Sequence, residues 1–170
     1  ALGYRANTIA RNLRAQTSDT IGFISDVVAS TAFAGDMIYG ADQVAAAAGK
    51  TLMIVNTERD PEVEARAIDS MFDRQVDAII YATMWHQVVE PPKALKEVNC
   101  VLLDARSEDP ADSWVVPDEE RGGYTATSYL IEAGHTRIGY IHEDNEYPAH
   151  PERFAGYRRA LDEHGIALDP

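Results

Sequence analysis

The stretch Thr20-Ile21-Gly22-Phe23-Ile24-Ser25 decides the fold, because its four central residues are apolar or glycine. Similar runs recur along the chain, and we predict strands at residues 20–25, 51–55, 77–81, 100–103, 114–116 and 137–142. Their cores are continuously apolar instead of alternating, which is typical of strands that helices cover on both faces. The run at 20–25 is therefore predicted to lie in a parallel sheet.

Helical patterns separate these strands, so the predicted fold class is α/β with a parallel sheet. The first helix has a stripe of apolar residues with helical spacing, namely Met37, Ala41, Val44, Ala45 and Ala48. A second is predicted to begin at Asp60-Pro61, a third to cover about 121–133, and a fourth about 152–164. Glycines just past three of them favour left-handed C-caps: Gly49, Gly134 and Gly165.

Length and composition exclude several classes of protein. The chain has 170 residues, of which 45% are hydrophobic and 25% charged, which is typical of a folded globular domain and not of a disordered chain. The longest stretch without a charged residue, 78–89, is too short to span a membrane. No secretion signal precedes the first strand, so we expect the protein to be cytoplasmic unless a signal has been removed.

The single cysteine, Cys100, excludes an intramolecular disulfide and every metal motif built on cysteine pairs. Net charge is −13, yet the first twenty residues carry a small positive excess from Arg5, Arg11 and Arg14. Since the acidic remainder repels nucleic acid, any contact with DNA is expected to come from this start or from a segment outside the chain.

Motifs for cofactors and catalysis are missing from the sequence. Gly49-Lys50-Thr51 has the wrong surroundings for a phosphate-binding loop, since Val44 stands where a glycine is required. No dinucleotide fingerprint follows the first strand, and no serine lies in a nucleophile elbow. A metal site at His142, Glu143, Asp144 and His150 is possible, but irregular spacing favours solvated loop residues. We therefore expect no cofactor, no metal and no enzymatic activity.

Polar and aromatic residues follow the predicted strands at their carboxyl ends, where open α/β sheets bind ligands. Asp26, Asn56, Tyr81, Trp85 and Asp104 lie at these positions. Carboxylates and amides beside aromatic rings suit a small polyhydroxylated ligand. The alternative is that Asp26 and Asp104 only cap the segments that follow them and that Trp85 fills a loop core.

The start of the chain has a second pattern. Asn7 is a candidate N-cap for two helical turns that place Ile9 and Leu13 on one side and make Arg11 and Arg14 available for phosphates. So short a helix would form only against a partner. The alternative is a frayed N-terminal arm.

Together these residues resemble the lactose-repressor (LacI/GalR) family of bacterial transcription regulators. The residues that carry the resemblance are 2–7, 9–14 and 20–24 at the start, Val76-Asp77-Ala78-Ile79-Ile80, Asp118 with Gly122-Gly123-Tyr124, Gly134-His135-Thr136-Arg137-Ile138-Gly139, and 153–161. The resemblance implies a homodimeric regulator, expected to be a repressor, whose two-lobed core is related to periplasmic sugar-binding proteins and closes on an effector.

By position, the resemblance implies effector contacts from Asp26, Phe33, Tyr81, Trp85, Asp104 and Arg153, and places Asp118 near the lobe junction. It implies that a hinge helix containing Asn7, Ala10, Arg11, Leu13 and Arg14 enters the minor groove of operator DNA, with Leu13 as a wedge. The expected division is hinge and linker at 1–18, first lobe at 19–117 and a truncated second lobe at 118–170. Sugar is the expected effector.

The sequence departs from the family pattern in two respects. No helix-turn-helix domain stands before Leu2 and most of a second lobe is missing after Pro170, so we expect the chain to be a fragment. Ala6 replaces a proline that many members have, which leaves the hinge less stiff. Two other hypotheses remain at this point: a periplasmic-type binding protein for transport, and a flavodoxin-like enzyme.

Overall fold

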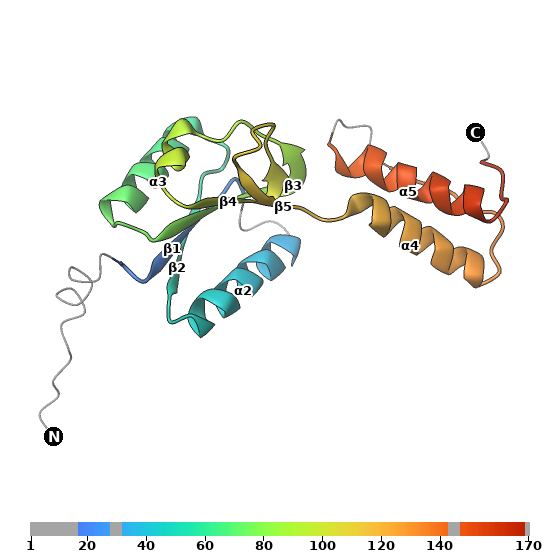
Figure 1. Ribbon diagram of the computed structural model, residues 1–170, viewed down its shortest axis with the longest axis horizontal. Helices are drawn as coiled ribbons and strands as arrows, with labels where there is room; N and C mark the ends of the chain where they lie inside the picture. The colour runs from blue at the N-terminus through green and yellow to red at the C-terminus, as the bar shows by residue number, and fades with distance from the viewer. Residues whose placement is uncertain (1–16, 28–31, 143–146, 169–170) are drawn as a thin grey trace, which may run out of the picture.

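The computed structural model describes residues 17–27, 32–142 and 147–168. Its elements in chain order are β1 (Thr20–Ser25), α2 (Ala32–Ala47), β2 (Thr51–Asn56), α3 (Pro61–Asp73), β3 (Ala78–Val88), the short 3-10 helix η1 (Lys93–Glu97), β4 (Cys100–Arg106), β5 (Ser113–Val115), α4 (Glu119–Glu132) and α5 (Ala149–Glu163). Strands and helices alternate through most of the chain, which confirms the α/β prediction (Figure 1).

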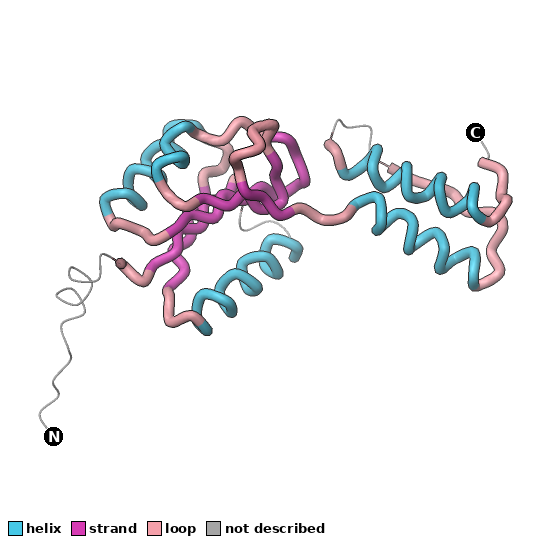
Figure 2. The backbone as a smooth tube through the Cα atoms, viewed as in Figure 1, coloured by secondary structure: helices cyan, strands magenta, loops and turns pink. Residues whose placement is uncertain are grey.

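The five strands form one sheet in the order β2-β1-β3-β4-β5, and every neighbouring pair is parallel. Helix α3 covers one face and α2 lies on the other (Figure 2). All five strand predictions in this region are confirmed, although β3 and β4 run further than expected. The pairing of β3 with β4 shifts between Ala82 and Gln87, and this irregular stretch lies at the carboxyl end of the sheet.

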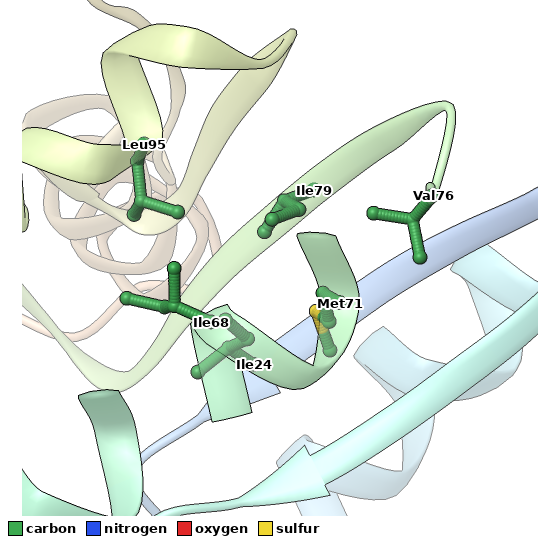
Figure 3. Packing of buried hydrophobic residues seen from close by; sticks show 6 residues of the cluster. All are labelled: Ile24, Ile68, Met71, Val76, Ile79 and Leu95. Atoms are coloured by element: carbon green, nitrogen blue, oxygen red, sulfur yellow. The ribbon is translucent and has the colours of Figure 1, made fainter. Parts of the chain in front are cut away.

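The core under α3 explains the apolar sequence of the strands. Ile24, Ile68, Met71, Val76, Ile79 and Leu95 pack into one buried cluster (Figure 3). Helix α3 begins as predicted, because the Asp60 side chain accepts hydrogen bonds from the backbone N–H groups of Glu62 and Val63. Gly22 leaves room for this cluster, since a Cβ there would overlap the Met71 side chain.

The apolar stripe of α2 is only partly buried. Ala45 is buried under the sheet, but Val44, a member of the same stripe, is 73% exposed. Small residues dominate this helix, so it touches the sheet through alanines such as Ala34 and Ala45 and leaves Val44 facing outward. The three glycine C-caps are confirmed, with φ of +71° at Gly49, +93° at Gly134 and +66° at Gly165.

The sixth predicted strand, 137–142, is not a strand, and 166–168 also lack strand structure. A strand needs a hydrogen-bonded neighbour, and within the described ranges none of β1–β5 pairs with these segments. Side chains of α5 hold the segment instead: the Tyr157 hydroxyl donates to the Ile138 carbonyl oxygen at 2.8 Å, and Tyr140 packs on Phe154. Ile141 is 99% exposed.

Helices α4 and α5 pack side by side after β5, and both begin at the end that lies nearer the sheet (Figure 1). Gly123 and Gly156 allow the close approach, because a Cβ at either would overlap backbone atoms of the other helix. We call residues 17–117, as far as they are described, the sheet unit and α4 with α5 the helical pair. No described helix is long and apolar enough to cross a membrane.

Candidate functional site

A cavity of about 670 Å³ lies between the carboxyl ends of β3 and β4 and the starts of α4 and α5. We call it the cleft. Four of the six predicted effector residues line it: Phe33, Trp85, Asp104 and Arg153. The other two, Asp26 and Tyr81, line a hollow of about 300 Å³ that adjoins it through Tyr147, a residue common to both. The structure therefore divides the predicted set between two neighbouring cavities.

Asp104 is the most unusual residue of the cleft. It ends the apolar run of β4, is only 3% exposed, and its Oδ1 atom has no hydrogen-bond partner. Burial, together with the negative charges of Glu119 and Asp26, raises the pKa of Asp104 to about 6. Its backbone is left-handed, with φ of 55°, a conformation that favours Asp, Asn and Gly. An unpaired buried carboxylate is costly to the fold, which is typical of a group kept for a ligand.

Arg153 is already held by a residue that the sequence did not indicate. Its Nη2 atom donates to Glu119 Oε1 at 3.0 Å and its Nε atom to Glu119 Oε2 at 2.5 Å. Glu119, at the start of α4, is only 5% exposed. Because Glu119 occupies two donors of the guanidinium, Arg153 is less available to clamp a carboxylate or phosphate than its sequence position suggests.

The other residue considered at this junction, Asp118, caps α4. Its side chain accepts a hydrogen bond from the Arg121 backbone N–H at 3.0 Å, and it lines neither the cleft nor the hollow.

Asp26 makes its hydrogen bonds to other residues of the protein. Its Oδ1 atom accepts from the backbone N–H groups of Val27 at 2.9 Å and Met84 at 3.1 Å, and its Oδ2 atom accepts from Arg59 Nε at 3.3 Å. Asp26 thereby ties the end of β1 to the irregular stretch of β3. Tyr81 is similarly engaged: its hydroxyl donates to Glu64 Oε2 at 2.8 Å, and burial with this carboxylate raises the pKa of Tyr81.

Aromatic rings form another wall of the cleft. Trp85 is partly exposed and stacks on Tyr147, with ring centroids 6.0 Å apart and an angle of 5° between the planes. The Arg59 guanidinium lies 4.4 Å from the centroid of the Trp85 ring. Phe33, at the start of α2, is also exposed to the cleft. Such rings provide the apolar surface that covers the C–H side of a ligand.

His86 is a cleft residue that the sequence reasoning missed. It lies in the irregular stretch of β3, its side chain is 1% exposed, and neither ring nitrogen has a hydrogen-bond partner. Burial lowers the pKa of His86, although the nearby Glu152 carboxylate opposes this. The signal in the sequence is that the predicted strand 77–81 is followed by further, mostly apolar residues up to this histidine, and β3 includes them.

His142 and His150 stack face to face, with centroids 3.7 Å apart, at the edge of the cleft. Within the described ranges no group of three or more His, Cys, Asp or Glu residues could hold a metal ion. The remaining members of the metal set that we considered, Glu143 and Asp144, lie outside the described residues. So do the predicted hinge residues Asn7, Ala10, Arg11, Leu13 and Arg14.

Comparison with known proteins identifies relatives of this chain. Residues 18–169 match the sequence profile described as "Periplasmic binding proteins and sugar binding domain of LacI family". The chain is 31% identical over 98% of its length to the HTH-type transcriptional regulator AscG of Escherichia coli (strain K12), and 29% identical over 99% to the HTH-type transcriptional repressor PurR of Aliivibrio salmonicida. It spans about half of each of these relatives, 51% in both cases.

A crystal structure of a LacI-family transcriptional regulator protein from Rhizobium etli superposes with a TM-score of 0.78 and 31% identity. The match covers 88% of this chain and 54% of that one. These relatives are named as regulators and not as transport proteins or enzymes.

Proposed function

The chain belongs to the family of periplasmic binding proteins and LacI-type sugar-binding domains, and from this premise we propose that it is the effector-binding core of a bacterial transcription regulator. The observation that carries the proposal is the cleft, which collects Asp104, Glu119 and Arg153 with the exposed faces of Phe33 and Trp85. A small polar ligand with hydroxyl groups fits this chemistry, because carboxylates accept hydrogen bonds from hydroxyls and the rings cover its C–H surface.

A neutral sugar suits the cleft better than an anionic ligand. Two buried carboxylates, Asp104 and Glu119, face the cleft together with one guanidinium, and Glu119 already pairs with that guanidinium. A phosphate or carboxylate would therefore meet an unneutralised negative charge at Asp104. A hydroxyl would instead give the unpaired Oδ1 atom of Asp104 a donor.

We further propose that residues 19–117, which make up nearly all of the sheet unit, form the first lobe. Residues 118–170, which include the helical pair, would begin the second lobe. Effector binding would favour one arrangement of the lobes and transmit it through residues 1–18 to a homodimer on operator DNA, in the cytoplasm. The hinge helix at Asn7, Ala10, Arg11, Leu13 and Arg14 would enter the minor groove there. Support comes from relatives named as HTH-type regulators.

The experiment is a thermal-shift screen of the chain against neutral pentoses and hexoses, their phosphorylated forms, and purine bases. A ligand that binds only the folded chain raises its melting temperature in proportion to the logarithm of its concentration above Kd. We expect a neutral sugar to give the largest shift. A larger shift with a sugar phosphate would contradict the proposed charge selectivity, and a shift with purines alone would replace sugar as the effector class.

A further inference from the structure

Glu152 joins the sheet unit to the helical pair. It lies in the first turn of α5, next to Arg153, but points its carboxylate to the other unit. Its Oε1 atom accepts a hydrogen bond from Arg106 Nη2 of β4 at 3.1 Å, and its Oε2 atom lies 4.0 Å from His86 Nδ1 of β3. One side chain of the helical pair thus faces the ends of two strands.

His86 lacks a hydrogen-bond partner in this arrangement. Its side chain is buried and neither ring nitrogen has a hydrogen-bond partner. Proteins rarely tolerate this state, because a buried donor without an acceptor has lost its hydrogen bonds to water and gained none in return. The nearest charged acceptor is Glu152 Oε2, about 1 Å too far for a hydrogen bond, for which N···O distances are about 2.7–3.2 Å. A small narrowing of the cleft would complete the bond.

The groups that face His86 favour a neutral imidazole as the donor. Glu152 and Arg153 approach from α5, Glu119 from α4, and Arg106 and Asp104 stand on β4. Because burial outweighs these charges, the pKa of His86 is lowered, and the ring is uncharged at neutral pH. The neutral tautomer with a proton on Nδ1 can donate to Glu152, whose charge Arg106 balances.

We propose that Glu152 is a latch between the two units, held by Arg106 in the arrangement described and completed by a hydrogen bond from His86 Nδ1–H when the cleft narrows. The Arg106–Glu152 pair alone is a weak tie, since both side chains are about one-third exposed and water screens their attraction. The buried His86 makes the latch favour the narrowed cleft, because only there does its ring gain a hydrogen-bond partner. The latch regulates the site of the proposed function but does not depend on the identity of its ligand.

Trp85 provides a reporter for the latch without any effector. Its ring stacks on Tyr147, so its quenching by acrylamide measures whether the Trp85–Tyr147 contact is present. The chain has two tryptophans, and Trp114→Phe leaves Trp85 as the only one. In that background we compare Glu152→Ala with Asp162→Asn, which removes the same charge from an exposed position of α5.

We expect Glu152→Ala to lower the ratio of stacked to unstacked Trp85 by about twofold to fivefold, the effect of losing a partly exposed ion pair, and Asp162→Asn to leave it unchanged. Equal quenching in the two variants would overturn the latch.

A double-mutant cycle separates the role of His86 from that of Arg106. We expect His86→Phe and Glu152→Ala to be non-additive in their effect on Trp85 quenching, because each removes the same bond from the molecules whose cleft is narrowed. Long-range ¹H–¹⁵N spectra of the His86 ring should also change in Glu152→Gln but not in Asp162→Asn. Additive effects together with an unchanged His86 spectrum would show that Glu152 acts through Arg106 alone. Because no effector is added, either result stands whether or not the cleft binds a sugar.

Discussion

Asp104→Asn should stabilise the chain while it weakens ligand binding. The pKa of the Asp104 carboxyl rises from 3.8 to about 6 on folding, because the group is buried beside other carboxylates. A shift of this size corresponds to at most about 3 kcal/mol that the ionised group costs the folded state. Asparagine removes the charge, keeps the shape and tolerates the left-handed backbone at φ of 55°, where alanine would add strain of its own.

The sign of the pH dependence follows from the raised pKa. Well below pH 3.8 the carboxyl is protonated in both the folded and unfolded chain, so it costs nothing. Between about pH 4 and 6 the unfolded chain ionises first, and the wild type loses stability relative to Asp104→Asn. Above about pH 6 the difference is constant.

Urea unfolding followed by circular dichroism at pH 4, 5, 7 and 8 measures this difference, with Asp162→Asn as the control for an exposed charge. We expect the variant to gain about 1–3 kcal/mol at pH 8 and less than about 1 kcal/mol at pH 4. If Asp104→Asn were less stable than the wild type at pH 8, or equally more stable at every pH, the argument that Asp104 is a strained buried carboxylate would be refuted.

Three further predictions concern the packing. Gly156→Ala should destabilise the chain by about 1–3 kcal/mol, because its Cβ would overlap the Glu120 carbonyl oxygen. Gly122→Ala should stabilise it by up to about 1 kcal/mol, because nothing lies within 4 Å of a Cβ there. Thermal unfolding compares the two variants, and equal stabilities would contradict the close helix contact. Met71→Ala should cost about 2–5 kcal/mol in urea unfolding, since the Met71 side chain of α3 is fully buried against the sheet. A loss below about 1 kcal/mol would show that the cluster in Figure 3 is loosely packed. Burial raises the pKa of Asp77, but hydrogen bonds from Lys50 and Ser18 outweigh burial and hold this pKa below 3.8. Asp77→Asn should therefore destabilise the chain at pH 7, and the difference in stability should disappear only in strong acid. A loss of stability that persists in strong acid would show that charge is not the cause.

Local signals in the sequence predicted most of the sheet unit. The strand at 20–25 was predicted with its observed limits, and the start signal Asp60-Pro61 and the glycine C-caps were placed correctly. These features depend on neighbouring residues alone. The predicted strand at 137–142 is wrong because strand pairing is a long-range property. The exposure of Val44 is not predictable because a stripe of alanines does not determine which side of a helix packs.

The site was only partly predictable for a similar reason. Strand ends indicated Asp104, and the family resemblance indicated Arg153, and both lie in the cleft. Glu119 and His86 were missed, because Glu119 reads as an ordinary acidic residue at a helix start and His86 lies in a strand that bends after residue 82. Only the approach of α4 and α5 to the sheet shows that these side chains are buried together.

The most direct test of the central claim is calorimetric titration of the neutral sugar that gives the largest thermal shift into the wild type and Asp104→Asn. If the sugar occupies the cleft and donates a hydroxyl to Asp104, the variant should bind it about tenfold or more weakly, as expected for the loss of a hydrogen bond to a charged group, while remaining folded and more stable than the wild type at pH 8. Equal affinity for both proteins would contradict the claim that the cleft is the effector site.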